Sequence, residues 1–281
     1  MIRIITDSAS DIADNGREDL VVLPINITFG QEEYQDGVTL THRMFYEKLI
    51  ECDELPSTSQ VPPFAFEEVF GKVRERGERA IVITMSSKLS GTWQSANIAA
   101  EGYGDMVYVV DSENASIGER ALVEYALRLK DQGLGFEEIV GKLEADKGRI
   151  RLIALLDTLE YLKKGGRISK TAALAGSLLS IKPVIAVQGG EVVILGKARG
   201  SRQGNNLLAE QIRQTGGVDF GKPFVLGYTG LEDTMLQKYI KDNEALWKGS
   251  VDALETASVG GTIGTHVGPG AIGVAFFSAG G

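Results

Sequence analysis

The sequence predicts an α/β protein of two domains, and three features of its 281 residues support this prediction. Apolar runs alternate with helix-permissive segments through the first half, which is typical of a parallel sheet covered by helices. After about residue 160 the pattern changes to a β-hairpin with further helices and strands, which indicates an α+β half with an antiparallel element. The length also exceeds that of a typical single domain. We therefore expect an α/β domain over residues 1–160 and an α+β domain over residues 161–281.

In the first half, each element is predicted from the spacing of its apolar residues. Short apolar runs predict strands at residues 2–6, 20–29, 80–85, 106–110 and 150–156. Helical spacing predicts helices at residues 41–50, 64–76, 118–132 and 136–146, with a further helix beginning just after Gly91. The proline-bounded segment at residues 55–63 predicts a stiff loop. Four of the strands are followed by Asp, Ser or Thr, so we expect a polar rim where parallel strands end.

The second half is predicted to contain a hairpin and a glycine-rich loop. Residues 182–187 and 192–197 flank two glycines and predict the hairpin. Helices are expected near residues 170–179, 201–214 and 231–243, and strands near residues 224–228, 251–256 and 271–276. The segment at residues 260–270 carries many glycines and His266, and we expect it to be a loop that allows close backbone approach.

Charge and composition exclude several classes of partner. Lys and Arg total 29 against 38 Asp and Glu, a formal net charge of -9, which argues against nucleic acid as a partner. The single cysteine, Cys52, excludes an intramolecular disulfide, and no charged-then-apolar leader precedes Ile2. No apolar run reaches the length needed to span a bilayer. These features predict a cytoplasmic location.

The common catalytic and metal-binding motifs are absent from the sequence. It has no G-x-x-x-x-G-K-[ST], H-E-x-x-H, C-x-x-C or G-x-S-x-G segment. A Ser/His/Asp hydrolase would have only His42 and His266 as bases, and no nucleophile is placed on a strained turn. Two distant histidines and one cysteine make a metal site a weak hypothesis. We therefore expect no metal and no cofactor.

The best candidate for a binding site is the strand, loop and helix start at residues 80–96. Exposed amides near Gly91 and Thr92 would favour an anion, although Ser90 at this position also fits a simple helix cap. Thr58 in the proline-bounded loop has ordinary turn chemistry as its alternative. His266 is a further candidate, with a solvent-facing loop position as its alternative.

Two groups of basic residues have the same two interpretations. Arg199 and Arg202 flank a glycine after the hairpin, where their guanidinium groups could reach a carboxylate or phosphate, or lie on a surface turn. Lys163, Lys164 and Arg167 surround two glycines and predict either a docking face or, as is more common, a solvated loop.

Seven motifs in order along the chain resemble those of the DegV family, a fatty-acid-binding family that includes the binding subunits of bacterial fatty acid kinase. They are T-D-S-A-S-D-I from Thr6, T-S-Q-V-P from Thr58, S-S-K-L-S-G-T-W-Q-S-A from Ser86, V-D-S from Val110, L-D-T-L-E-Y-L-K-K-G-G-R-I from Leu156, S-I-K-P from Ser180 and G-T-H-V-G-P-G from Gly264. The chain departs from the family pattern at Val61-Pro62, where the family usually has Pro-Ser. It departs again at residues 199–202, where an R-T-R-like segment is often found.

This resemblance implies a fold and a function. The fold would be a mostly parallel three-layer α/β/α domain followed by an α+β domain with a mixed or antiparallel sheet, with one long-chain fatty acid enclosed between them. Thr58, Ser90 and His266 would bind the carboxylate, the Gly91 and Thr92 amides would add donors, and Arg199 or Arg202 would assist phosphoryl transfer together with His266.

The resemblance also implies partners. The chain would be a carrier rather than an enzyme, and a separate ATP-dependent fatty acid kinase subunit would convert the bound acid to an acyl phosphate for phospholipid synthesis. Transient contact with a membrane surface would allow lipid exchange. Two alternatives stay open: a small-molecule enzyme of the dihydroxyacetone-kinase-like superfamily, and a lipid-responsive regulatory protein.

Overall fold

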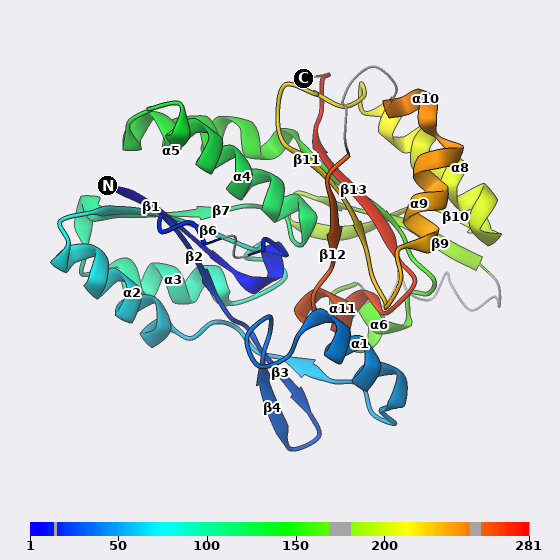
Figure 1. Cartoon of the computed structure of the whole chain (residues 1–281), viewed down its shortest axis with the longest axis horizontal. Coiled ribbons are helices and arrows are strands. Elements are labelled where there is room, and N and C mark those ends of the chain that lie inside the picture. Colours follow the sequence, from blue (N-terminus) through cyan, green and yellow to red (C-terminus); the bar gives the residue numbers. More distant parts are fainter. Residues whose placement is uncertain (14–15, 169–180, 248–253, 281) are drawn as a thin grey trace.

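The computed structural model describes residues 1–13, 16–168, 181–247 and 254–280. Its two main sheets lie in the N-terminal and C-terminal halves of the chain (Figure 1). The helix expected at residues 170–179 and the beginning of the strand expected at residues 251–256 lie outside the described residues.

The first sheet is a parallel four-stranded sheet between two layers of helices. Its order is β2 (Leu20–Leu23), β1 (Ile2–Asp7), β6 (Arg79–Thr84) and β7 (Val107–Asp111). One face packs on α2 (Pro63–Glu75) and α3 (Thr92–Ala100), the other on α4 (Ile117–Asp131) and α5 (Phe136–Asp146) (Figure 1). Successive side chains of a strand point to opposite faces of the sheet, so Ile4 packs on one layer of helices and Ile5 on the other. The predicted α/β/α arrangement is confirmed.

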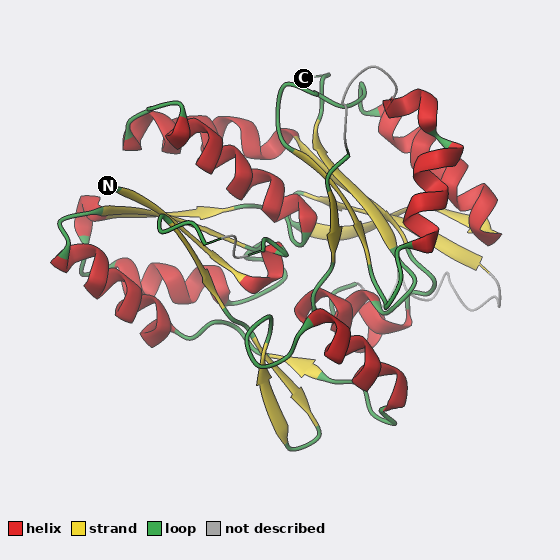
Figure 2. Ribbon diagram, in the orientation of Figure 1, coloured by secondary structure: helices red, strands yellow, loops and turns green. Residues whose placement is uncertain are grey.

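The second sheet is a mixed six-stranded sheet. Its order is β10 (Glu191–Arg199), β9 (Ile181–Gln188), β8 (Ile150–Leu155), β13 (Ile272–Phe277), β11 (Phe224–Tyr228) and β12 (Thr256–Ser258). Of these neighbours, only β11 and β12 run parallel. One face packs on α8 (Gly200–Gln214), α9 (Thr234–Asp242) and α10 (Glu244–Trp247) (Figure 2). The other face packs on α4.

The assignment of β8 to the parallel rim is wrong. This strand pairs antiparallel with both β9 and β13, so its carboxyl end is not at the edge where β1, β6 and β7 end. An apolar run suits either kind of pairing when both faces are covered, and the sequence pattern therefore does not distinguish them. The domain boundary near residue 160 itself stays a prediction.

A small third sheet, with one helix beside it, links the two halves. It consists of β4 (Glu32–Gln35), β3 (Asn26–Phe29) and β5 (Ser57–Thr58), and α1 (His42–Glu51) lies between β4 and β5 in the chain. The single strand expected at residues 20–29 is interrupted at Pro24, which has no N–H for a ladder. The segment at residues 26–58, which contains β3, β4, α1 and β5, extends beneath the second sheet in the view of Figure 1, and there α1 contacts α11 (Gly261–Val267).

The expected loop at residues 260–270 contains this helix, so the loop assignment is wrong for residues 261–267. Its glycines serve close packing. A Cβ at Gly264 would lie 2.5 Å from Cε1 of Phe45 and 2.8 Å from Oη of Tyr46, and a Cβ at Gly261 would lie 2.6 Å from Cδ1 of Ile27. None of the described helices is both long enough and apolar enough to cross a bilayer.

Candidate functional site

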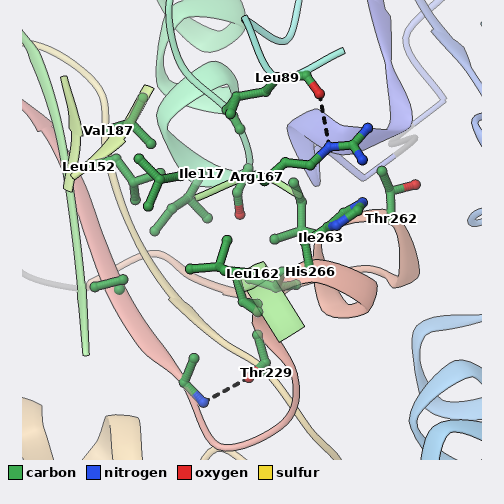
Figure 3. Close-up of a pocket in the computed structure, with 18 of the residues that line it drawn as sticks. Leu89, Ile117, Leu152, Leu162, Arg167, Val187, Thr229, Thr262, Ile263 and His266 are labelled. Atoms are coloured by element: carbon green, nitrogen blue, oxygen red, sulfur yellow. Dashed lines mark hydrogen bonds between the residues drawn. The ribbon is translucent and has the colours of Figure 1, made fainter. Parts of the chain in front are cut away.

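A cavity with an empty volume of about 940 Å³, including its opening to solvent, lies between the two halves of the chain (Figure 3). Most of its lining is apolar. The apolar side chains include Ile25, Met85, Leu89, Ile117, Leu152, Leu156, Leu162, Ile185, Val187, Val192, Val259, Ile263, Val267 and Ile272. A concave and mostly apolar lining of this kind is typical of small-molecule pockets.

The second sheet forms the floor of the cavity, and strand register explains its shape. Gly227, Gly273 and Ala154 are neighbours across β11, β13 and β8, so the middle of the floor carries almost no side chain. Leu152 on β8 lies on one side of this row, and Leu156, the residue after β8, lies on the other. Strand geometry separates these two leucines by about 13 Å along the sheet. The floor is therefore a shallow apolar trough.

Four polar side chains gather at the Leu156 end of the cavity. Thr58 comes from β5, Ser90 from the turn before α3, Arg167 from the turn after α6 (Glu160–Lys164), and His266 from α11. Thr58 Oγ1 lies 2.9 Å from Nε2 of His266. Figure 3 shows His266 and Arg167 in this part of the cavity. The structure thus brings together Thr58, Ser90 and His266, as the resemblance implied.

Arg167 lines the cavity, whereas the sequence predicted it only as part of a docking face or a solvated loop. Its Nε donates to the Leu89 carbonyl at 3.2 Å and its Nη1 to the Gly165 carbonyl at 2.6 Å, which holds the guanidinium beside the cavity (Figure 3). Among the described residues, no carboxylate pairs with it. The available signal was the pair of glycines before it, since Gly166 adopts a φ of 71° in the turn after α6.

His266 is held in its neutral form. Burial, with a smaller contribution from the positive charge of Arg167, lowers the pKa of His266 to about 4. Its Nδ1 is buried and makes no hydrogen bond with any described residue. A Cβ at Gly165 would lie 2.2 Å from this nitrogen, so only glycine fits there. A neutral imidazole and an arginine at one end of an apolar cavity are suited to an anionic group.

The turn before α3 supports Ser90. Ser90 Oγ accepts the N–H of Thr92, the first residue of α3, at 3.2 Å and Ser90 also lines the cavity. The N-cap position itself is Gly91, so Ser90 bonds the helix start from the residue before the cap. Thr92 itself is buried, and its Oγ1 accepts the N–H of Val61 at 3.2 Å. A Cβ at Gly91 would lie 1.9 Å from Oε1 of Gln60. Neither Gly91 nor Thr92 lines the cavity.

Arg199 and Arg202 do not reach this site. Both are exposed, Arg199 at the end of β10 and Arg202 in the first turn of α8, and neither lines the cavity. Their position supports the surface interpretation of this turn. Lys163 and Lys164 are exposed on α6, close to Arg167 in the chain.

A second, polar pocket lies beyond the Leu152 end of the trough. Glu113, Lys147 and Arg151 are among the residues that line it. Val187 lines both this pocket and the main cavity, so this residue stands at the junction of the two. Within the described part of the chain, no group of three or more His, Cys, Asp or Glu side chains is arranged to hold a metal ion.

The fold and this cavity define a two-domain α/β protein with a largely apolar ligand pocket that is polar at one end. The family model described as "uncharacterised protein, DegV family" matches residues 1–279. The chain belongs to the DegV family. A DegV domain-containing protein of Caldanaerobacter subterraneus is 34% identical over 284 residues, covering 98% of each chain. One from Deinococcus radiodurans is 34% identical over 281 residues, covering 98% of this chain and 97% of its own.

Solved structures of the family share the whole fold. The DegV family protein of Thermus thermophilus, described for its fatty acid binding, is 30% identical with a TM-score of 0.88 and 99% coverage of both chains. DegV of Bacillus subtilis, a fatty acid binding protein, is 28% identical with a TM-score of 0.84 and 98% coverage of both. A stearic-acid-binding protein of Eubacterium ventriosum is 26% identical with a TM-score of 0.86, covering 98% of this chain and 97% of its own.

Proposed function

We propose that the protein binds one long-chain fatty acid in this cavity, with its carboxylate among Thr58, Ser90, Arg167 and His266. The observation that carries the proposal is the convergence of these four side chains, from four separate segments, at one end of a mainly apolar cavity. The fatty acid binding described for the related DegV structures supports it. The ligand would lie between the two predicted domains, because both halves of the chain line the cavity.

The energetics of such a ligand suit this lining. Burial of roughly fourteen methylenes at about 0.8 kcal/mol each provides on the order of 11 kcal/mol before ordering costs. A buried carboxylate costs several kcal/mol unless donors match its oxygens. Two hydroxyls, an imidazole N–H and a guanidinium can supply those donors. The tail therefore provides affinity, and the polar end determines the orientation.

The bound acid would be the substrate of a separate ATP-dependent fatty acid kinase subunit. A carboxylate oxygen would attack the γ-phosphorus of ATP, giving an acyl phosphate for phospholipid synthesis and ADP. Arg167 and His266 would stabilise the charge that develops near the carboxyl group. Arg199 and Arg202 are less suited to this role, because both are exposed and neither lines the cavity. Lys163 and Lys164, exposed beside this end, are a candidate docking face. The proposal places the protein in the cytoplasm, with transient membrane contact for lipid exchange.

Mass spectrometry of denatured recombinant protein tests the binding step, and a stoichiometric long-chain fatty acid is the expected result. Bound dihydroxyacetone without fatty acid would instead favour the enzyme of the dihydroxyacetone-kinase-like superfamily. Formation of acyl phosphate only when kinase and ATP are added would support the carrier over a lipid-responsive regulator. A His266→Ala variant with unchanged affinity and unchanged turnover would remove His266 from the proposal.

A further inference from the structure

The first turn of α11 is bound by carboxyl groups from the N-terminal half. Asp36, which is 3% exposed, accepts the N–H of Gly261 at Oδ1 and the N–H of Thr262 at Oδ2, each at 3.0 Å. Asp11 Oδ1 accepts the N–H of Gly260 at 2.6 Å. Three successive amides at the beginning of this helix therefore find acceptors far away in the sequence.

Asp36 is itself fixed in place. Its N–H donates to the Ile25 carbonyl at 3.0 Å, and its Oδ2 also accepts the hydroxyl of Ser8 at 3.2 Å. It follows β4, which pairs with β3, and β3 pairs with β5 through Ile27 and Thr58. One small sheet thus holds both the acceptor for α11 and Thr58, the side chain that meets His266.

The periodicity of α11 relates this contact to the cavity. Thr262 and His266 are four residues apart and so lie on the same face of the helix, and both line the cavity. The opposite contact, with Phe45 and Tyr46, is made by glycines, which present a smooth surface with no side chain to interlock. The bonded first turn, together with the packing of Ile263 and Val267 against neighbouring core clusters, therefore sets the rotation of α11 about its axis.

We propose that Asp36 is a positioning residue of the head-group site: it sets the rotation of α11 and so keeps His266 Nε2 against Thr58 Oγ1, ready for a carboxylate. This rests on the proposed function and adds a residue that does not line the cavity. Because its effect passes through His266, Asp36 contributes to recognition of the carboxyl group and not to binding of the tail.

The test compares hexadecanoic acid with hexadecan-1-ol, which has the same tail and no carboxylate, on the full-length protein. In Asp36→Asn only one side-chain oxygen stays available, so one of the two amides loses its acceptor, and we expect acid affinity to fall on the order of tenfold. Affinity for the alcohol should change less than about twofold, because the tail contacts are unaltered. The acid-to-alcohol ratio is therefore the readout.

Asp7→Asn is the matched control. Asp7 is buried and also accepts two amides, those of Ala9 and Met85, but it makes no bond to α11. We expect its acid-to-alcohol ratio to match that of wild type. Ser8→Ala is a milder second variant that decides the test if Asp36→Asn does not fold, and it should shift the ratio in the same direction by about twofold.

An acid-to-alcohol affinity ratio that stays at the wild-type value in Asp36→Asn, or in Ser8→Ala if Asp36→Asn does not fold, would overturn the role of Asp36. Wild-type protein that binds neither compound would refute the proposed function instead, so the two failures are distinguishable. A change in the imidazole NMR resonances of His266 in Asp36→Asn, absent from Asp7→Asn, is expected as independent support. Unchanged His266 resonances in Asp36→Asn would count against the proposal.

Discussion

Gly264→Ala directly perturbs the packing of α11. The added methyl would lie 2.5 Å from Cε1 of Phe45 and 2.8 Å from Oη of Tyr46, and both rings are fully buried. Alanine is favoured over glycine in a helix by about 1 kcal/mol, whereas overpacking a core costs about 1–3 kcal/mol. Because these contacts are far inside van der Waals distance, we expect the upper end of that cost and a net loss of about 2 kcal/mol in the free energy of unfolding.

Urea unfolding and fatty acid titration of the same samples measure the effect. Displacement of α11 should also weaken fatty acid binding, since the helix carries His266. Gly141→Ala in α5 is the matched control, because a Cβ there meets nothing within 4 Å, and it should stabilise the protein by about 0.5–1 kcal/mol. If the two variants shifted stability by the same amount and in the same direction, the packing explanation for Gly264 would be refuted.

Three further predictions concern the cavity. Arg167→Met should weaken fatty acid binding about tenfold to a hundredfold by removing charge-assisted donors, as measured by calorimetry, and unchanged affinity would exclude Arg167 from the head-group site. Because the pKa of His266 falls from 6.5 to about 4 on folding, the folded state takes up its proton later, and the contribution of His266 to ligand-free stability should be lost as pH drops through this interval, whereas Asp7 and Asp11, whose pKa burial raises to about 7, act in the opposite direction. The stability of wild type relative to His266→Gln, measured by thermal unfolding, should therefore decrease as pH drops over this range, and a constant difference would contradict the assignment. Val187→Ala should join the main cavity to the polar pocket and shift the co-purified acids towards longer chains, and an identical chain-length profile by mass spectrometry would count against this junction.

The sequence predicted those elements whose apolar periodicity lies within the element itself. The runs that became β1, β6 and β7 carry their own periodicity, and the alternating burial of Ile4 and Ile5 follows from it. The antiparallel pairing of β8 depends on β13, which is more than a hundred residues away in the sequence. The periodicity of β8 itself contains no information about this partner. The two-residue β5 is too short to show any pattern.

Within the candidate site, the motifs predicted Thr58, Ser90 and His266, and the structure brings all three to one end of the cavity. The cavity position of Arg167 was not predicted because an arginine after two glycines has the composition of a solvated loop, and one of the two carbonyls that hold its guanidinium, that of Leu89, is distant in the sequence. The helical state of α11 was missed for a related reason: its glycines are required by Phe45 and Tyr46, which lie far away in the sequence.

The proposed head-group site unites Thr58 on the small third sheet and His266 on α11 across 208 residues of chain, so it exists only after these distant segments have folded and packed together. A ligand that binds only this native arrangement shifts the folding equilibrium, adding about 2.7 kcal/mol when its concentration is a hundred times the Kd. Under the proposed function, the supply of fatty acid would then control how often the chain opens to proteases. The lifetime of the protein would report the lipid status of the cell even before any kinase acts.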